Sequence, residues 1–491
     1  MKSKFSKVLS ILLSVVLVIS SFYLLYQVIR LNVLPSKFLF PLTIGVVVLD
    51  AIFILLLVYF SKNVVSKIVC IVLTLFICVA SCMGGYYISK TQGALSNITN
   101  VAKHAKNTVS VIVKESSSIK DKSQLNGVSV GSLRLNEQGS KKTLKELSGE
   151  GIVLNQTEYD SMTALLEAFY NGDVDSIIIN ESSRSQILDI EAYSNFDSNT
   201  RVVYQTSYKV KNNDSATSVS DITSKPFNVL ISGSDTRGGF DENGRSDVIM
   251  IATVNPKTHT ILLTSVPRDF YVTTACDAGD GCMQGALDKI THTGIHGTNT
   301  TKRTVEQLLG IEINYTFKVG FDTVTELVDV LGGVDVYVEP GYATTTSQFS
   351  VHEGVNHLNA EQALAFARER YSYTEGDRQR TKNQQQVLMG IVKEATKPSV
   401  ITNYAAIMDT MANTFSTTMS NEEITDLIKY QLNNNPTWKM EQYMVDGTGD
   451  TLMCAELGDA ASVMVPDQST VKMAKDKINA VLAGKSSEDV K

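Results

Sequence analysis

The stretch F-N-V-L-I-S-G-S-D-T-R-G-G at residues 227–239 decides the fold class, because an apolar run leads directly into a glycine-rich loop. We predict a strand over 227–231 that presents this loop at its C-terminal end. Two further apolar runs, 247–254 and 260–266, flank the turn N-P-K-T at 255–258 and predict a hairpin. A β-sheet therefore opens this domain.

Downstream of the hairpin, helical and strand patterns alternate. The predicted helices and strands, in chain order, are 304–309, 314–319, 323–331 and 334–338, with Gly332-Gly333 ending the second helix. This order predicts an α/β domain over 226–484 with a central mixed, mostly antiparallel sheet flanked by helices. The tail 485–491 is small and polar, and we expect it to fray.

A smaller α/β domain is predicted upstream, over 109–210. Runs 128–133 and 176–179 have the composition of short strands, and 161–170 has helical spacing of its apolar residues. We call it the accessory domain. The polar segment 211–225 predicts a linker between the two domains.

The first ninety residues carry three apolar runs, 8–29, 39–60 and 68–88. Each has about the twenty residues that a helix needs to cross the hydrocarbon core of a membrane. We predict a three-span transmembrane region over 1–90, followed by a juxtamembrane stalk over 91–108.

Three lysines, Lys2, Lys4 and Lys7, precede the first span. Positive charge tends to stay on the cytoplasmic side, so we predict a cytoplasmic N-terminus. Three crossings then place the domains after residue 90 outside the cell, in a multi-pass protein of the cell membrane.

The net charge of −7 argues against a protein that coats nucleic acid, which needs a broad basic surface. No Cys/His spacing is typical of a zinc site. Cys276 and Cys282 bracket the loop C-D-A-G-D-G-C, and an exported domain permits a disulfide there, although the sequence leaves its formation open.

A cluster of arginines lies between Ala365 and Lys382. This stretch holds five basic residues (Arg368, Arg370, Arg378, Arg380, Lys382) and three acidic ones (Glu369, Glu375, Asp377), a balance of 5 − 3 = +2. The segment N-A-E-Q at 359–362 predicts a capped helix that reaches Arg368, and a second helix begins near Asp377. The cluster therefore lies at a helix–loop–helix junction.

Two interpretations of this cluster are open. Asp377, Arg380 and Gln384 have the spacing of one helix face, and guanidinium groups bind phosphate oxygens in pairs, which suits a pyrophosphate. The alternative is a solvated face of Arg–Glu pairs without a ligand.

Residues at predicted strand ends favour the first interpretation. Asp235 follows the first strand, Arg245 and Asp247 stand in G-R-S-D before the second, and Arg268 follows the third in V-P-R-D-F. Loops at strand ends commonly carry sites. Two aspartates with phosphate oxygens would suit Mg²⁺, which takes a few carboxylates and completes its shell with water and substrate.

The ordered set of motifs resembles the LytR-CpsA-Psr family, and most of all its members in streptococcal capsule biosynthesis. The motifs are G-S-D-T-R-G-G, G-R-S-D-V-I-M-I, S-V-P-R-D, L-V-D-V-L-G-G-V-D-V, L-N-A-E-Q-A-L-A-F-A-R-E-R and G-D-R-Q-R-T-K-N-Q-Q. The resemblance implies a magnesium-dependent phosphotransferase that moves a capsular polysaccharide from an undecaprenyl pyrophosphate carrier to peptidoglycan. Other capsule-assembly proteins are possible partners.

The resemblance also implies roles for individual residues. The implied magnesium ligands are Asp235 and Asp247. The implied pyrophosphate-binding residues are Arg245, Arg268, Arg368, Arg370, Arg378, Arg380 and Gln384. The expected catalytic residues are Arg268, Asp247 and Asp377, of which the two aspartates are candidate bases on chemical grounds.

Two other functions remain open on the sequence. One is a non-enzymatic membrane regulator of capsule synthesis or transcription, although the predicted cytoplasmic segments are too small for a DNA-reading module. The other is a lipid pyrophosphatase, which differs only in using water as the acceptor.

Overall fold

The computed structural model describes residues 2–60, 63–101, 104–134, 137–211, 214–234, 242–277, 281–397, 406–412 and 415–491. The chain forms two compact units. The first comprises Met1–Asn97, Ala395–Ala412 and Ser420–Thr437, and the second comprises Ile98–Glu394, Asn413–Met419 and Trp438–Lys491.

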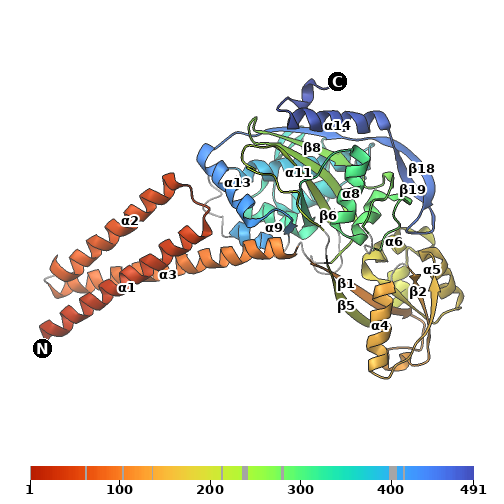
Figure 1. Cartoon of the computed structure of the whole chain (residues 1–491), viewed down its shortest axis with the longest axis horizontal. Coiled ribbons are helices and arrows are strands. Elements are labelled where there is room, and N and C mark those ends of the chain that lie inside the picture. The colour runs from red at the N-terminus through yellow and green to blue at the C-terminus, as the bar shows by residue number, and fades with distance from the viewer. Residues whose placement is uncertain are drawn as a thin grey trace. The chain divides into compact units, whose positions relative to one another are not determined.

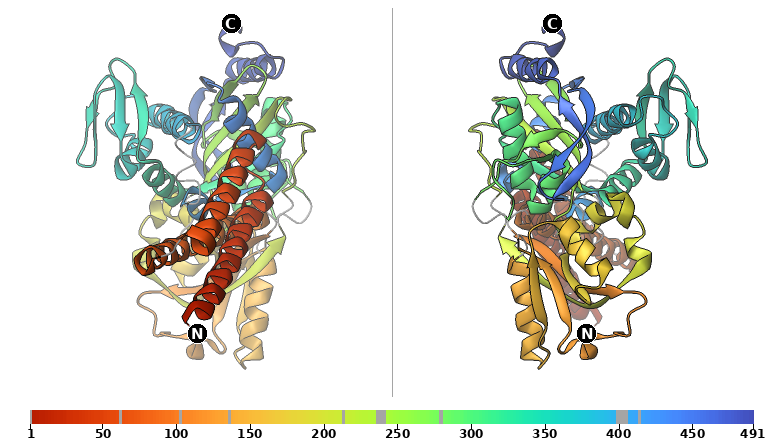
Figure 2. Two further views of the ribbon diagram at one scale, coloured as in Figure 1. Left: turned by 90° about the vertical axis from the view of Figure 1, so that its left-hand side faces the viewer. Right: turned by 90° about the vertical axis from the view of Figure 1, so that its right-hand side faces the viewer.

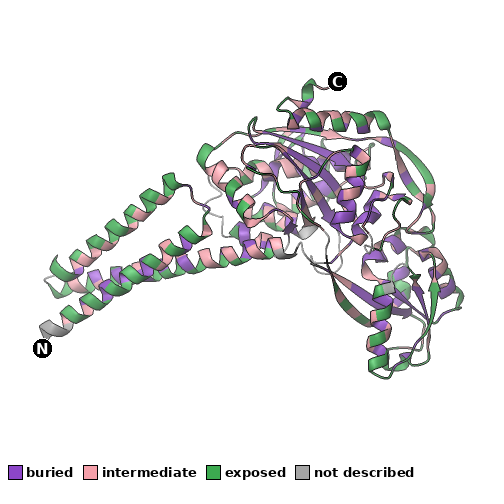
Figure 3. Ribbon diagram, in the orientation of Figure 1, coloured by how far each residue is buried: buried purple, intermediate pink, exposed green. Residues whose placement is uncertain are grey.

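The first unit contains the apolar helices α1 (Lys2–Leu31), α2 (Ser36–Leu55), which continues as the π-helix η1 (Leu56–Phe60), and α3 (Val64–Val101) (Figure 1). Over the described residues, three helices are long and apolar enough to cross a membrane, as predicted. Many residues of these helices are exposed (Figure 3). The large apolar residues Phe22, Phe40 and Phe76 are among the exposed ones. Lipid would cover these side chains.

Helix α3 is longer than the predicted third span. Its apolar stretch Val64–Thr99 has 36 residues, which at 1.5 Å per residue is about 54 Å, well beyond the roughly 30 Å of a hydrocarbon core. Much of the predicted stalk is therefore a continuation of this helix, and the first strand of the accessory domain begins at His104 rather than near 109.

The same unit includes helix α13 (Asn421–Asn434). Lys429 Nζ donates to Asn32 Oδ1 over 2.8 Å, and Lys90 Nζ pairs with Asp409 Oδ2 over 3.0 Å. The α1–α2 loop and the C-terminal third of α3 thus both contact the segment 406–434.

The accessory domain is a five-stranded sheet in the order β3-β2-β4-β1-β5, with helices packed on it. Parallel pairing joins β2 to β3 and β4, and antiparallel pairing joins β1 to β4 and β5. The strands are β1 (His104–Lys114), β2 (Ser129–Leu133), β3 (Asn155–Tyr159), β4 (Ser176–Asn180) and β5 (Thr200–Lys211). The α-helices are α4 (Glu137–Gly149), α5 (Met162–Asn171), α6 (Arg184–Asp189) and α7 (Phe196–Asn199).

Strand β4 shows why this segment is continuously apolar. Alternate side chains of a strand point to opposite faces of the sheet. Ile177 and Ile179 pack with Phe169 of α5, whereas Ile178 packs with Leu147 of α4. Both faces of the accessory sheet are therefore covered, and the predicted strands and helix of this domain are confirmed.

The C-terminal domain is built on a mixed six-stranded sheet in the order β16-β11-β6-β7-β8-β17. Its strands are β6 (Phe227–Ser234), β7 (Ser246–Asn255), β8 (Thr260–Val266), β11 (Tyr315–Gly320), β16 (Phe415–Thr417) and β17 (Lys439–Met444). The pairs β6–β11 and β8–β17 are parallel, and the other neighbours are antiparallel. The predicted α/β class, mixed sheet and β7–β8 hairpin are confirmed.

Helices cover both faces of this sheet (Figures 1 and 3). On one face, α8 (Thr298–Leu309) and α14 (Gln468–Leu482) pack against Leu230, Ile251 and Leu262 in the main core. On the other, Gln385 of α11 (Asp377–Ala395) donates to the β8 atoms Leu263 O and Ser265 Oγ, over 3.4 and 2.9 Å.

A separate lobe, teal in Figure 2, stands apart from the main sheet. Its core joins α9 (Phe321–Leu331), α10 (Ala360–Arg368) and the pair β12–β15. The smaller strands of the domain are β9 (Tyr271–Thr273), β10 (Leu287–Lys289), β12 (Val334–Val338), β13 (Thr344–Thr345), β14 (Ser350–Val351), β15 (Gly354–Leu358), β18 (Gly447–Cys454) and β19 (Asp459–Pro466). The domain also contains the short 3₁₀-helices η6 (Ile290–His296) and η7 (Ser487–Asp489).

The C-terminal tail does not fray as expected, because a buried carboxylate holds it. Glu441 accepts hydrogen bonds from Ser486 Oγ and from the Ser487 backbone N–H, both over 2.8 Å, and pairs with Lys439 Nζ over 2.8 Å. Burial alone would raise the pKa of Glu441, but hydrogen bonds from Lys439, Ser487 and Ser486 outweigh burial and lower the pKa to about 2.

We expect Glu441→Gln to loosen the tail and to lower the melting temperature at pH 7 by about 5 °C, since hydrogen bonds to a buried charge are lost. A carboxyl group whose pKa is lowered by folding stabilises the fold above its ordinary pKa of 4.5, and this contribution disappears as the pH falls toward 2. The difference between wild type and variant should shrink over that range.

The matched control is Glu488→Gln. Glu488 pairs with the same Lys439, but its side chain is 69% exposed, against 1% for Glu441. Differential scanning fluorimetry and the rate of carboxypeptidase digestion measure the effect. Equal behaviour of the two variants would show that Glu441 does not anchor the tail.

Candidate functional site

The site begins where β7 starts, beside a chain of buried hydroxyl groups. Ser232 Oγ and Ser246 Oγ lie 2.9 Å apart, and Ser246 Oγ lies 3.0 Å from Thr301 Oγ1. Thr293 Oγ1 of η6 lies 2.9 Å from Thr301 Oγ1. These bonds join β6, β7, α8 and η6, and they fix the backbone just before Asp247.

Close packing of backbones reinforces this arrangement. A Cβ atom on Gly294 of η6 would lie 2.5 Å from both Gly244 O and Ser246 Oγ. A residue other than glycine would therefore push η6 away from the start of β7. The contact brings the neighbouring Thr291 to the Asp247 carboxylate, where its hydroxyl donates to Oδ1 over 3.4 Å.

Arg268, at the end of β8, closes the first half of the site. Its Nη1 donates to Asp247 Oδ1 over 2.9 Å, and Arg245 Nε lies 4.0 Å from the same oxygen. The hairpin register makes this possible, because Ile249 pairs with Val266 and the start of β7 therefore lies beside the end of β8. One carboxylate thus gathers two arginines.

The second half of the site comes from the α10–α11 junction. Helix α10 begins at the predicted capping box of Asn359 and Gln362, and ends at Arg368. Asn383 Nδ2 of α11 donates to Phe366 O over 3.0 Å, which locks the two helices together. The first turn of α11 then carries Arg380.

On that turn Arg380 Nη2 forms an ion pair with Asp377 Oδ1, and the two residues lie on one helix face as predicted. The two halves of the site interact electrostatically. Asp377 raises the pKa of Arg268. Asp247 raises the pKa of Arg380, whereas Arg268 and Arg370 lower it.

The pKa values of Arg268 and Arg380 are shifted in opposite directions. Burial lowers the pKa of Arg268, but nearby carboxylates, Asp247 foremost, outweigh burial and raise the pKa above its ordinary value. Burial is the main cause that lowers the pKa of Arg380; Asp377 and Asp247 oppose it, whereas Arg268 and Arg370 add to it, and the net pKa lies below its ordinary value. Arg380 is therefore a buried cation whose neighbouring carboxylates do not offset its loss of solvent.

Three guanidinium donors in this site are buried and lack a hydrogen-bond partner. They are the Nε atoms of Arg245, Arg268 and Arg380. A buried donor left unpaired costs about 1–3 kcal/mol. Such a cost on three neighbouring arginines is what a site for an anion with several oxygens would show, because the anion supplies the missing acceptors.

The other predicted site residues lie as follows. Arg368 is exposed at the end of α10, and Gln384 is half-buried on α11, one turn after Arg380. Arg370 packs its guanidinium on the Tyr371 ring, 4.6 Å from the ring centre. Asp235 lies outside the described residues, and its role as a metal ligand stays a prediction.

Arg378 points to a different part of the domain. Its Nη2 pairs with Asp446 Oδ1 over 2.7 Å and donates to Gly447 O over 3.1 Å. Two residues along a helix face nearly opposite directions, which separates Arg378 from Arg380. The structure therefore does not bring Arg378 to the arginines around Asp247, and its predicted role is untested.

Four residues near the site were not predicted. Asp269 Oδ2 lies 3.7 Å from Arg268 Nε, and Lys289 Nζ lies 3.4 Å from Asp269 Oδ1. Thr291 bonds Asp247, and Asp189 of the accessory domain pairs with Arg245. Asp269 adjoins Arg268 in the quoted motif V-P-R-D-F, but the other three are distant in sequence and carry no pattern.

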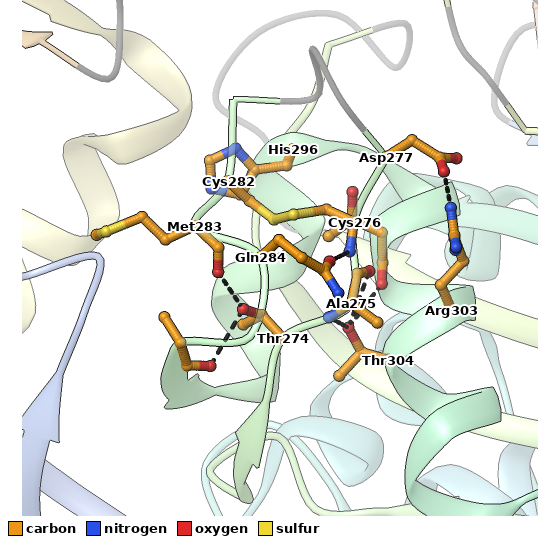
Figure 4. Close-up of a disulfide and its surroundings, with 12 residues drawn as sticks. Thr274, Ala275, Cys276, Asp277, Cys282, Met283, Gln284, His296, Arg303 and Thr304 are labelled. Carbon is orange, nitrogen blue, oxygen red and sulfur yellow. Dashed lines mark hydrogen bonds and ion pairs between the residues drawn. A yellow bond between two sulfur atoms is a disulfide. The ribbon is translucent and has the colours of Figure 1, made fainter.

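A disulfide joins Cys276 and Cys282, the pair that the sequence left open. Figure 4 shows the loop around it: Gln284 Oε1 accepts from the Cys276 backbone N–H over 2.5 Å, and Asp277 pairs with Arg303. The nearby histidines are held by acids, since His292 Nδ1 lies 2.7 Å from Asp288 and His296 Nε2 lies 3.0 Å from Glu456. These pairs tie η6 to the rest of the domain.

A magnesium ion would find one suitable ligand among the described residues. No group of three or more His, Cys, Asp or Glu side chains there is arranged to hold a metal. Mg²⁺ needs only one or two protein carboxylates when phosphate oxygens and water complete its shell. Asp247 meets this requirement, and Asp235 is the predicted second ligand.

Comparison with known proteins identifies the family. The model of the LytR_cpsA_psr family matches residues 192–480, more than half of the chain. The chain belongs to the LytR_cpsA_psr family. The family region spans the whole C-terminal sheet and both halves of the arginine site.

Relatives in this family carry transferase names. The polyisoprenyl-teichoic acid–peptidoglycan teichoic acid transferase TagU of Bacillus cereus is 31% identical over 243 residues, which are 49% of this chain and 77% of the relative. TagU of Bacillus subtilis is 34% identical over 203 residues, which are 41% of this chain and 63% of the relative.

Solved structures are similar as well. Protein gbs0355 of Streptococcus agalactiae has 25% identity and a TM-score of 0.45, covering 53% of this chain and 89% of its own. The B. subtilis TagU structure has 28% identity and a TM-score of 0.41, covering 52% of this chain and 97% of its own.

The unpaired arginine donors predict anion binding. We expect saturating inorganic pyrophosphate to raise the melting temperature of the full-length protein by about 5 °C. Arg380→Gln and Arg268→Gln should each weaken pyrophosphate binding at least about tenfold, measured by isothermal titration calorimetry.

Arg303→Gln is the control, because Arg303 is a partly exposed arginine that pairs with Asp277 outside the site. The Arg303→Gln protein should bind pyrophosphate as tightly as wild type does. An equal loss in Arg303→Gln and Arg380→Gln would show that binding is nonspecific and that the buried donors do not form an anion site.

Proposed function

We propose that this protein is a phosphotransferase that moves a capsular polysaccharide from undecaprenyl pyrophosphate to peptidoglycan. The observation that carries the proposal is the set of buried guanidinium Nε atoms without a hydrogen-bond partner, on Arg245 and Arg268 beside Asp247 and on Arg380 beside Asp377. The transferase names of its relatives support a substrate with a polyisoprenyl carrier and a peptidoglycan acceptor.

In the proposed reaction a peptidoglycan hydroxyl attacks the phosphorus next to the sugar. The new P–O bond joins glycan phosphate to peptidoglycan as a phosphodiester, and the bond to the bridging pyrophosphate oxygen breaks. Undecaprenyl phosphate leaves with that electron pair. The negative charge of the transition state is carried by phosphate oxygens. The peptidoglycan hydroxyl is itself the nucleophile, so no protein nucleophile is needed.

The arginines would bind and orient the pyrophosphate. Arg268 is held in place by Asp247, and Arg380 by Asp377, so each guanidinium is oriented before substrate arrives. Donors fixed in a partly buried site stabilise developing charge strongly, because they need no reorganisation. Arg370, and Arg368 and Gln384 as predicted from the sequence, would complete the cradle.

Bound at Asp247 with Asp235, Mg²⁺ would neutralise charge on the phosphate oxygens. The attacking hydroxyl must also lose a proton. Asp247 already accepts from Arg268 and Thr291, and its side chain is 12% exposed, whereas that of Asp377 is 30% exposed. Asp377 is therefore the better candidate for the base.

The membrane region would keep the site near its lipid carrier. Lys429 donates to Asn32 of the α1–α2 loop, and Asp409 pairs with Lys90 of α3, which favours placing that loop and these residues on one side of the membrane. The lysines ahead of the first span favour a cytoplasmic N-terminus, and three crossings then give an extracellular C-terminal domain.

The test incubates the full-length protein in detergent with undecaprenyl-pyrophosphate-linked glycan, peptidoglycan and Mg²⁺, and identifies the products by mass spectrometry. We expect peptidoglycan carrying glycan through a phosphodiester, together with undecaprenyl phosphate. Arg268→Ala should lower the rate about 100-fold or more, whereas Arg303→Ala should not. Chelation of Mg²⁺ should stop the reaction, and its return should restore it.

Other outcomes would assign the other functions. Free glycan phosphate without attachment to peptidoglycan would identify a lipid pyrophosphatase. Binding of the lipid without any product would identify a non-enzymatic regulator. Normal transfer by Arg268→Ala would overturn the proposed site.

A further inference from the structure

We propose that Asp189 of the accessory domain is a positioning residue for Arg245, so that the accessory domain completes the pyrophosphate site. This inference rests on the proposed function and extends it to a domain without an assigned task. Asp189 is the last residue of α6, and its Oδ2 accepts from Arg245 Nη1. The partners are 56 residues apart in sequence.

The Arg245 side chain has two ends in different environments. Its Nη1 is held by Asp189, while its Nε is buried, lacks a hydrogen-bond partner and lies 4.0 Å from Asp247 Oδ1. The side chain as a whole is 13% exposed. Asp189 therefore fixes the direction in which the free Nε donor faces.

Without the Asp189 carboxylate, the acid left to pair with Arg245 among the described residues would be Asp247. At 4.0 Å its Nε is already close enough for a small side-chain rotation to form a direct hydrogen bond. In that hydrogen bond Arg245 Nε would no longer be available to the anion, and it would compete with Arg268 for Asp247 Oδ1. Asp189 prevents this collapse by holding the other end of the guanidinium.

A second contact of the accessory domain supports the same segment. Glu242 forms an isolated bridge with Lys106 of β1, and its carboxylate accepts from Thr108 Oγ1 and pairs with Lys106 Nζ over 3.3 Å. The accessory domain therefore holds the chain at 242 and at 245, immediately before Asp247.

The backbone around Asp189 is held by packing and by ion pairs. The next residue, Ile190, packs against the buried cluster of Cys454 and Leu457 in the C-terminal domain. Within α6, Arg184 pairs with Glu181 over 2.6 Å and with Asp197 over 3.0 Å. A carboxylate fixed in this way can orient its partner, which a freely rotating surface acid could not.

The test uses the full-length protein and two readouts, the dissociation constant of inorganic pyrophosphate and the rate of glycan transfer. We expect Asp189→Asn to weaken pyrophosphate binding and to lower kcat/KM by about tenfold each, because Arg245 is misdirected. The melting temperature should stay that of wild type, since Asp189 is 53% exposed. Asp189→Glu should recover part of the loss.

Asp160→Asn is the matched control. Asp160 lies in the same domain and forms an exposed ion pair with Arg134 over 2.7 Å, away from Arg245. This variant should bind and transfer as wild type does. A double-mutant cycle with Arg245→Lys then tests the route: in that background Asp189→Asn should cost less than about twofold.

The outcomes separate this inference from the proposed function. Wild-type binding and transfer in Asp189→Asn, or effects of Asp189→Asn and Arg245→Lys that multiply, would overturn the role of Asp189. A wild-type protein that binds pyrophosphate but transfers no glycan would overturn the proposed function, while weaker binding in Asp189→Asn would still support the inference. Failure of the wild type to bind pyrophosphate would overturn both.

Discussion

The ion pair between Arg268 and Asp247 is the interaction on which the rest of the site depends. It joins the end of β8 to the start of β7, and the same carboxylate draws Arg245 and the hydroxyl of Thr291. Each of these two arginines also has a second acid nearby, Asp189 for Arg245 and Asp269 for Arg268. The fold therefore gathers oriented guanidinium groups at one end of its central sheet, and their Nε donors suit an anionic ligand.

Three layers of structure maintain this arrangement. The hydroxyl chain from Ser232 to Thr293 holds β6, β7, α8 and η6 in register beneath Asp247. Gln385 anchors α11, the helix that carries Arg380, to β8. The accessory domain then acts on Arg245 from outside the C-terminal domain. Each of these contacts uses neutral or paired groups.

This arrangement also gives the membrane region a physical purpose in the proposed function. A polyisoprenyl carrier cannot leave the bilayer without exposing a long apolar chain to water. An enzyme that acts on its pyrophosphate must therefore work close to the membrane surface. Three helices long and apolar enough to cross a membrane precede the accessory and C-terminal domains, and they would meet that requirement.

The sequence by itself determined the three spans, the α/β class, the central strands and the capped helix that ends at Arg368, because these depend on local periodicity, turns and caps. It also placed Asp377 and Arg380 on one face of a helix, since helical spacing is local. Only the tertiary structure decided the direction of Arg378, the anchoring of the tail by Glu441, the closure of the Cys276–Cys282 disulfide and the partnership of Asp189 with Arg245. Apart from the short disulfide loop, these contacts join residues far apart in the chain, and no periodic pattern encodes which distant acid a given arginine will meet.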